Sequence, residues 1–472
     1  MKIITLVRIN ENKFMKSFLS FLFAVSYILL NSSCSLSKQI SKQAKAILLN
    51  DTAISTGHFG ISIYEPATNT YWYNHNETHY FIPASNTKLF TLYAGLKYLG
   101  DSLAGAKYYH LGESIFIQPT GDPTFLHPDF AFQPLFELLK NNKGRIYTDG
   151  HTDIPIKKFG SGWNFDDYKY AYMAERNKFP IFGNVLTISK QPVSKAIPFN
   201  DTTVSIKKVS GNVSYWVTPK IFSEQITDKT TYFSKIKITR DIDANNFTIA
   251  NDSIDGERLD VNSIPFTTRN GVTAAEILSS ILNKEVFNGA QCNPVTTENI
   301  LYSQPSDSLF KPMMHRSDNF FAEQTLLMAS NAKLGYMSDV DMIDFILKSD
   351  LKEIPQRPKW VDGSGLSRYN LFTPKSLIYL LDKMKKEFSW NRLTTILATG
   401  GEGTISNYYK KDSGFIYAKT GTLSNNCALS GFLITNKGKL LIFSILANNY
   451  ITGATPVRRA VERFLEGIRA KY

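Results

Sequence analysis

Three short polar motifs contain the residue types that serine acyl transfer requires. Ser85 and Lys88 stand three positions apart, which on a helix places the hydroxyl and the amine on one face, one turn apart. An uncharged amine in that place can take the proton of the hydroxyl and turn the serine into a nucleophile. Ser317-Asp318-Asn319 follows in the middle of the chain, and Lys419-Thr420-Gly421-Thr422 lies near its end.

The context of Ser85 separates it from other serines with the same spacing. The Ser-x-x-Lys pattern is weak evidence alone, because it also begins at Ser35, Ser205, Ser234, Ser308, Ser330 and Ser349. Ser85 follows the strand-like Tyr80 to Ile82 and precedes apolar residues at helical spacing that end before Gly100. We therefore expect a strand to deliver Ser85 to a helix start, where the helix dipole favours developing negative charge.

The other two motifs each allow a structural and a functional interpretation. Ser and Asp are good helix N-caps, so 317–319 is explained by a cap alone, and Ser-x-Asn recurs at Ser210 and Ser424. The functional interpretation gives Ser317 a proton relay to a leaving amine, while Asn319 holds Lys88 and a substrate amide. Lys419 stands at an expected strand end, where a basic side chain is usually solvated. In the functional interpretation, Lys419 binds a substrate carboxylate and Gly421 lets the substrate backbone approach closely.

The elements that must position these motifs form an α+β pattern. The segment from 104 to 300 is β-rich, with short strand-like runs between Asn, Asp, Gly and Pro. An amphipathic helix at 457–470 closes the chain and is expected to pack on the sheet rather than on a membrane. The other expected strands are 60–64, 71–73, 114–118, 204–209, 232–239, 247–250, 414–419, 428–435 and 440–447, and helices are expected at 320–327 and 342–347.

The three motifs in this order are the signature of penicillin-binding proteins and class A β-lactamases. The chain resembles the type-4, low-molecular-mass class C penicillin-binding proteins, the D-alanyl-D-alanine carboxypeptidase/endopeptidases. Ser317 follows Lys88 by 229 positions, far more than a β-lactamase-like domain needs. The further matching segments are 83–89, 121–124, Gly162-Trp163 with Asp166-Asp167, 317–323, 362–368 and 418–423.

The resemblance implies an α+β fold with a penicillin-binding-protein/β-lactamase-like catalytic domain, an antiparallel sheet flanked by helices, and two inserted β-rich domains. The expected boundaries are a signal peptide at 1–33, the catalytic domain at 34–103 and 300–472, one inserted domain at 104–180 and 265–299, and a second at 181–264.

The resemblance also implies roles for the motif residues. Ser85 would attack the bond between two D-alanines of a peptidoglycan stem peptide, with Lys88 as the base, an assignment that is disputed among these enzymes. Backbone N–H groups of Ser85 and Thr422 would form the oxyanion hole. Lys419, Thr420, Gly421 and Thr422 would bind the terminal carboxylate. No metal or other cofactor is expected, and β-lactams would be covalent inhibitors.

Two other functions share part of this pattern. A β-lactamase needs a fast deacylating base, and the chain has no Glu-x-x-Leu-Asn run of the class A kind. A silent wall-binding lipoprotein would keep the fold without turnover, but the intact motifs argue against it. The pair His75 and His79 lies between strand-like runs rather than on a helix, and 362–365 is expected to be a tight turn.

The N-terminal segment has the form of a secretory signal. Four basic residues precede the apolar run from Phe18 to Leu30, which is too short for a permanent membrane span. Met15 is an alternative start. Cys34 follows in the place of an acylated lipoprotein cysteine, so we expect a periplasmic protein, either free or anchored through a lipid on Cys34. The net charge of +12 favours an anionic wall or membrane surface over nucleic acid.

Overall fold

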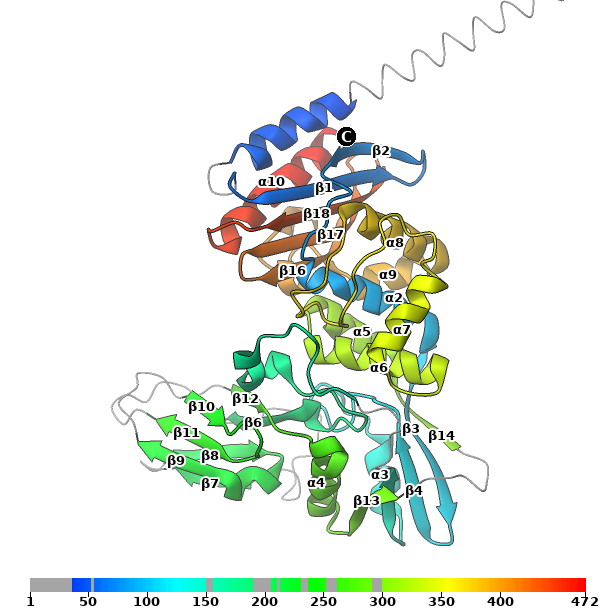
Figure 1. Ribbon diagram of the computed structural model, residues 1–472, viewed down its shortest axis with the longest axis vertical. Coiled ribbons are helices and arrows are strands. Elements are labelled where there is room, and N and C mark those ends of the chain that lie inside the picture. The colour runs from blue at the N-terminus through cyan, green and yellow to red at the C-terminus, as the bar shows by residue number, and fades with distance from the viewer. Residues whose placement is uncertain are drawn as a thin grey trace, which may run out of the picture.

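The computed structural model describes residues 36–51, 55–149, 156–189, 205–209, 213–230, 237–251, 261–290 and 299–472. The expected signal peptide and Cys34 lie outside the described residues. The molecule is elongated, with a six-stranded sheet at one end, smaller sheets at the other and a layer of helices between them (Figure 1). No described helix is long and apolar enough to cross a membrane.

The six-stranded sheet is antiparallel, in the order β15-β16-β17-β18-β1-β2. Because helices cover both faces, its central strands are buried along almost their whole length instead of alternating. Helix α10 (Ala454–Lys471) and the helical residues 36–44 cover one face, and α8 (Pro374–Glu387) covers the other. The strands are β1 (His58–Glu65), β2 (Thr70–His75), β15 (Ala398–Thr399), β16 (Ile416–Leu423), β17 (Asn426–Ile434) and β18 (Leu440–Asn448).

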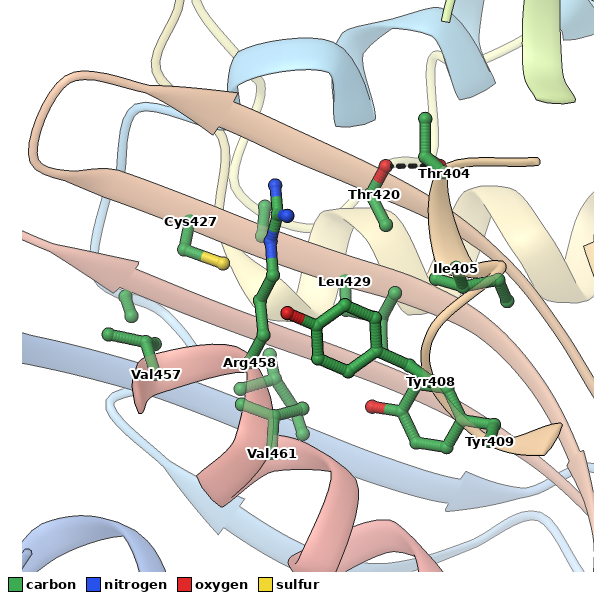
Figure 2. A pocket seen from close by; sticks show the side chains of 13 residues that line it. Thr404, Ile405, Tyr408, Tyr409, Thr420, Cys427, Leu429, Val457, Arg458 and Val461 are labelled. Carbon is green, nitrogen blue, oxygen red and sulfur yellow. Dashed lines mark hydrogen bonds between the residues drawn. The ribbon is translucent and has the colours of Figure 1, made fainter. Parts of the chain in front are cut away.

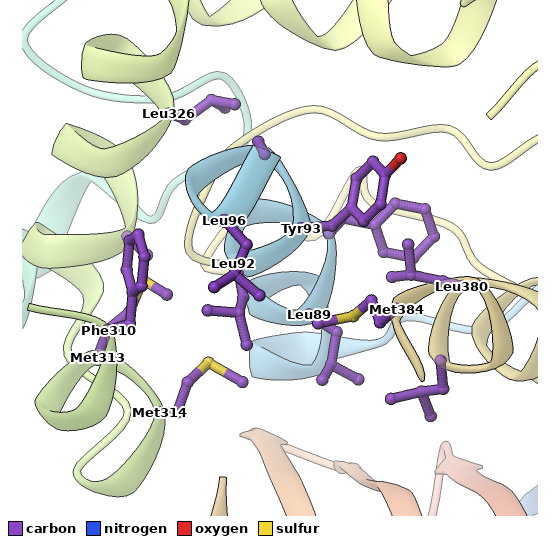
Figure 3. Packing of buried hydrophobic residues seen from close by; sticks show 14 of the residues in the cluster. Leu89, Leu92, Tyr93, Leu96, Phe310, Met313, Met314, Leu326, Leu380 and Met384 are labelled. Carbon is purple, nitrogen blue, oxygen red and sulfur yellow. The ribbon is translucent and has the colours of Figure 1, made fainter. Parts of the chain in front are cut away.

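Helix α2 (Lys88–Tyr98) lies at the centre of the helical layer. Leu89, Leu92, Tyr93 and Leu96 are almost completely buried, since its neighbours contact it on several sides. Figure 3 shows these side chains between Phe310, Met313 and Met314 of α5, Leu326 of α6, and Leu380 and Met384 of α8. The other helices of the layer are α5 (Ser306–His315), α6 (Asn319–Leu334), α7 (Asp339–Lys348) and α9 (Trp390–Ile396).

Three smaller sheets occupy the other end of the molecule. A five-stranded sheet, β13-β5-β4-β3-β14, combines parallel and antiparallel pairs, and a four-stranded and a three-stranded sheet have the orders β12-β6-β8-β7 and β10-β11-β9. Helices α3 (Pro134–Asn141) and α4 (Val272–Leu282) share their hydrophobic core. The strands are β3 (Ser102–Leu111), β4 (Ser114–Pro119), β5 (Ile146–Asp149), β6 (Val185–Ser189), β7 (Ser205–Val209), β8 (Val213–Thr218), β9 (Ile226–Thr230), β10 (Lys237–Arg240), β11 (Phe247–Asn251), β12 (Val261–Pro265), β13 (Val286–Ala290) and β14 (Asn299–Pro305).

The predicted α+β class is confirmed, including the β-rich middle, the final hairpin and the final helix on the sheet. The domain boundaries stay a prediction. The strand expected before Ser85 is wrong, because only Phe81 forms an isolated bridge, with Phe372. Pro83 has no N–H to donate and Ala84 takes a positive φ of 47°, so the chain turns before a strand can form.

Candidate active site

Ser85 lies in a single 3₁₀ turn, Ala84–Thr87, that leads directly into α2. The Thr87 hydroxyl closes this turn by donating to the carbonyl of Ala84 at 2.9 Å. The side chain of Ser85 is half-buried, whereas Lys88 at the start of α2 is completely buried. The expected pair is therefore formed, and Lys88 Nζ donates to Ser85 Oγ at 3.0 Å.

Three oxygen atoms surround the Lys88 amine. Besides Ser85 Oγ, it donates to Asn319 Oδ1 at 2.7 Å and to the Ser364 carbonyl at 2.6 Å. Burial lowers the pKa of Lys88 to about 8, although the carboxylates of Asp362 and Glu323 act in the opposite direction. About a tenth of a group with that pKa is neutral at pH 7, so the free amine that a general base requires is present.

The Ser317-Asp318-Asn319 motif is both a helix cap and a part of the site. Asp318 is the N-cap of α6, since its side chain accepts from Phe321 N at 2.9 Å. Asn319 points its oxygen at Lys88 and donates through Nδ2 to the Tyr172 carbonyl at 3.1 Å. Ser317 has a positive φ of 63°, which is costly for a residue other than glycine and directs its hydroxyl to the second lysine.

Lys419 on β16 is completely buried and completes the polar network. Its amine donates to Ser317 Oγ at 2.8 Å and to the Thr420 carbonyl at 2.7 Å. Burial, together with the positive charges of Lys88 and Arg458, holds the pKa of Lys419 well below its usual range. The Asn86 side chain donates to the Lys419 carbonyl at 2.8 Å, so β16 is tied to the turn that carries Ser85.

The two residues after Lys419 make contacts that the sequence did not indicate. A Cβ on Gly421 would lie 2.5 Å from the Pro83 carbonyl oxygen, so the glycine allows β16 to pack against the Ser85 turn. The Thr420 hydroxyl donates to Thr404 Oγ1 at 2.6 Å. Thr420 lines a small, mostly apolar cavity of about 20 Å³ between the sheet and α10, together with Cys427, Tyr408 and Arg458 (Figure 2).

Ser85 opens into a cleft of about 670 Å³. The cleft is large enough for a short peptide and collects both acidic and basic side chains. Asn319 and Thr422 line it beside Ser85, so the cleft contains residues from all three motifs. Its other lining residues are Gly162, Asn164, Asp167, Tyr172, Gly365, Leu366, Arg368, Leu423 and Ser424.

Two buried carboxylates support the site, and no sequence motif indicated a chemical role for either. Glu323 accepts from the Ser364 N–H at 2.7 Å, and thereby holds the residue whose carbonyl contacts Lys88. Burial and the nearby Asp362 raise the pKa of Glu323 to about 7. Asp362 accepts from the N–H groups of Gly365 and Ser367 at 2.8 and 2.7 Å, which fixes the tight turn expected there.

Two residues from 104–180, the range expected to belong to an inserted domain, contact these carboxylates. Arg176 Nη1 lies 3.2 Å from Glu323 Oε2 and 2.6 Å from Asp339 Oδ2. Trp163 Nε1 donates to Asp362 Oδ2 at 2.8 Å. Trp163, Asp362 and Glu323 lie in segments that match the family resemblance, and nothing else in the sequence indicated their importance. Within the described residues, no group of three His, Cys, Asp or Glu side chains is arranged to hold a metal ion.

Comparisons with known proteins agree with this geometry. A model of the family described as D-Ala-D-Ala carboxypeptidase 3 (S13) matches residues 40–471. The D-alanyl-D-alanine carboxypeptidase of Actinomadura sp. (strain R39) is 23% identical over 87% of this chain and 81% of its own length. The crystal structure of penicillin-binding protein 4 from Haemophilus influenzae has a TM-score of 0.71 at 19% identity and covers 92% of this chain and 99% of its own. Its complex with a β-lactam has a TM-score of 0.66 and the same identity and coverage.

Proposed function

Since the chain belongs to the D-Ala-D-Ala carboxypeptidase 3 (S13) family and is a serine-type D-alanyl-D-alanine carboxypeptidase, we propose that Ser85 is its nucleophile. The observation that carries this proposal is the contact of 3.0 Å between Ser85 Oγ and the amine of Lys88 at the floor of the cleft. The substrate class is peptidoglycan peptides that end in D-alanyl-D-alanine.

Acylation begins with proton transfer from Ser85 to neutral Lys88. Ser85 Oγ attacks the carbonyl carbon of the penultimate D-alanine, and the N–H groups of Ser85 and Thr422 stabilise the oxyanion. Such donors contribute about 3–4 kcal/mol each in other serine hydrolases. Both residues line the cleft. The Lys88 pKa of about 8 supports its role as the base, because neutral amine is present near neutral pH.

Bond cleavage then requires a proton at the leaving nitrogen. Ser317 donates its hydroxyl proton to that amine and is reprotonated through Lys419, whose amine lies 2.8 Å from Ser317 Oγ. The carbon–nitrogen bond breaks, the terminal D-alanine leaves, and Ser85 carries the acyl group as an ester. Water then attacks the ester carbonyl: its hydroxyl joins the acyl group, Lys88 returns the proton it holds to Ser85 Oγ, and the remaining proton of the water restores Lys419. Asn319 keeps Lys88 in place throughout by accepting its hydrogen bond.

The terminal carboxylate of the substrate is bound at the end of the cleft formed by β16. Lys419 contributes its amine there, whose charged form a bound carboxylate favours against the effect of burial, and Thr422, which lines the cleft, supplies a hydroxyl donor. Thr420 contributes through its carbonyl, which accepts from Lys419 Nζ and orients that amine. Gly421 contributes by letting the strand reach the Ser85 turn.

Export and anchoring complete the proposal. The reaction takes place outside the cytoplasm, where residues 1–33 would direct the chain and where Cys34 would receive a lipid. The basic residues before the apolar run and the position of Cys34 support this assignment. The mass of the mature N-terminus distinguishes a lipid-modified Cys34 from plain cleavage.

Labelling with a fluorescent penicillin, followed by peptide mass mapping, tests the nucleophile. We expect a stable adduct on Ser85 that is absent from the Ser85→Ala variant. Ser349→Ala is the matched control, because Ser349 begins another Ser-x-x-Lys sequence but is exposed at the end of α7, and this variant should label normally. A folded wild-type protein that forms no adduct would refute the proposal. Rapid release of hydrolysed penicillin would instead favour a β-lactamase.

A further inference from the structure

Arg458 connects the last helix of the chain to the cleft. It lies in the first half of α10, next to Val457, which is completely buried against the sheet. Its Nη2 atom donates to Thr422 Oγ1 at 2.6 Å. Figure 2 shows the side chain extending from α10 across the face of the sheet, with its guanidinium directed toward the strand that carries Thr420. Arg458 therefore donates a hydrogen bond directly to a residue that lines the cleft.

Arg458 differs from the other arginines of α10 in its ion-pair partners. Arg459 pairs with Glu462, Arg463 pairs with Asp51, and Arg469 pairs with Asp412. Within the part of the chain that the structure describes, Arg458 has no carboxylate at ion-pair distance. Its positive charge also acts on Lys419, at the end of the cleft where a carboxylate is expected. Its charge is thus not neutralised by a carboxylate of the described residues.

The contact with Thr422 has a direction that follows from the chemistry of the two groups. A guanidinium stays protonated and has no acceptor, so the Thr422 hydroxyl can only accept from it. The one proton of that hydroxyl must then point to a different acceptor. The Lys419 amine already donates to Ser317 and Thr420, so Thr422 and Arg458 add a donor and a permanent charge that Lys419 alone does not provide.

We propose that Arg458 is a specificity-determining positioning residue, which fixes the Thr422 hydroxyl as a donor to the terminal carboxylate of the substrate and adds positive charge beside it. The inference rests on the carboxylate site proposed above. It explains how the enzyme distinguishes a peptide with a free carboxyl end from one whose end is blocked. Arg458 acts through Thr422 and does not take part in bond making.

Two matched substrates test this role in the full-length protein. One is an acylated tripeptide that ends in D-Ala-D-Ala with a free carboxylate, and the other is its C-terminal amide. The variants are Arg458→Met, which approximately keeps the length of the side chain, and Arg458→Lys, which keeps the charge but loses the planar guanidinium with its several N–H donors. Arg463→Met is the matched control on the same helix, because its partner Asp51 lies away from the cleft lining.

For Arg458→Met we expect kcat/KM on the carboxylate substrate to fall about tenfold, mainly through KM, which corresponds to about 1.4 kcal/mol. Arg458→Lys should restore part of the loss. The value for the amide and both values for Arg463→Met should stay within a factor of two. In a Thr422→Val background the Arg458→Met substitution should have a much smaller effect, because the two residues act as one unit.

An equal loss on both substrates would overturn the inference, since it would show a structural effect on the sheet. An unchanged value for the carboxylate substrate would also overturn it, as would full additivity of the Arg458 and Thr422 substitutions. A wild-type protein that cleaves neither peptide and is not acylated at Ser85 would overturn the proposed reaction, and the inference with it. The labelling experiment therefore separates these two failures.

Discussion

The substitution Gly365→Ala is predicted to disable the site through one added methyl group. Gly365 lies in the turn after Ser364, has a positive φ of 81°, and packs directly against the turn that carries Ser85. A Cβ at this position would lie 1.9 Å from the Ala84 carbonyl oxygen and 2.8 Å from Thr87 Oγ1. Both neighbours are in the Ser85 turn, so the clash is transmitted to the nucleophile.

The size of the effect follows from the distances. Carbon and carbonyl oxygen need about 3.0 Å or more, so one of the two backbones must move by about 1.1 Å. A displacement of about 1 Å at a reacting group costs about 100-fold in rate. The positive φ adds about 1 kcal/mol of conformational cost for alanine, which lowers the free energy of unfolding without affecting the rate. Acylation should therefore fall about 100-fold.

The assay is the second-order rate constant of acylation by a chromogenic β-lactam, measured beside thermal unfolding. Gly335→Ala is the matched control, because Gly335 has a φ of 86° but has no atom within 4 Å of its added Cβ. We expect the control to lose about 1 kcal/mol of stability and to keep its acylation rate. Normal acylation by a folded Gly365→Ala variant would refute the argument that this turn positions Ser85.

Two further substitutions test the groups beneath Lys88. Glu323→Gln removes a negative charge that raises the Lys88 pKa, so the acid limb of the pH profile of the acylation rate should move to lower pH. A shift to higher pH would contradict this. The control Glu353→Gln changes an exposed residue and should leave the pH profile unchanged. Trp163→Phe removes the hydrogen bond to Asp362 and should lower the free energy of unfolding by about 1–2 kcal/mol, measured by urea titration, whereas unchanged stability would show that the bond contributes nothing.

The sequence predicted the residues whose arrangement is local. Ser85 and Lys88 meet because three positions on a turn and helix start place them together whatever the rest of the chain does. The last two strands and the final helix were equally predictable, because a short polar turn joins two apolar runs and an amphipathic pattern follows. The family resemblance placed Ser317 and Lys419 in one site, but their direct contact was not predicted.

Long-range packing explains what the sequence could not predict. Gly421 was expected to admit a substrate backbone, yet its missing side chain is required by Pro83, more than 300 positions earlier. The Thr420 hydroxyl donates to Thr404, 16 positions earlier, and this contact depends on where the chain before β16 packs against that strand. Arg458 had no local signal at all, since its importance depends on where α10 crosses the sheet.

The middle of the chain contributes side chains to the active site. Arg176 and Trp163 lie within 104–180, the range predicted as an inserted domain, yet they contact the carboxylates that position the Ser364 turn. A buried Glu323 without Arg176 would be an uncompensated charge, which costs several kcal/mol unless the group takes up a proton. Either outcome would alter the electrostatic surroundings of Lys88. This part of the chain therefore contributes to the protonation of the base as well as to the shape of the cleft.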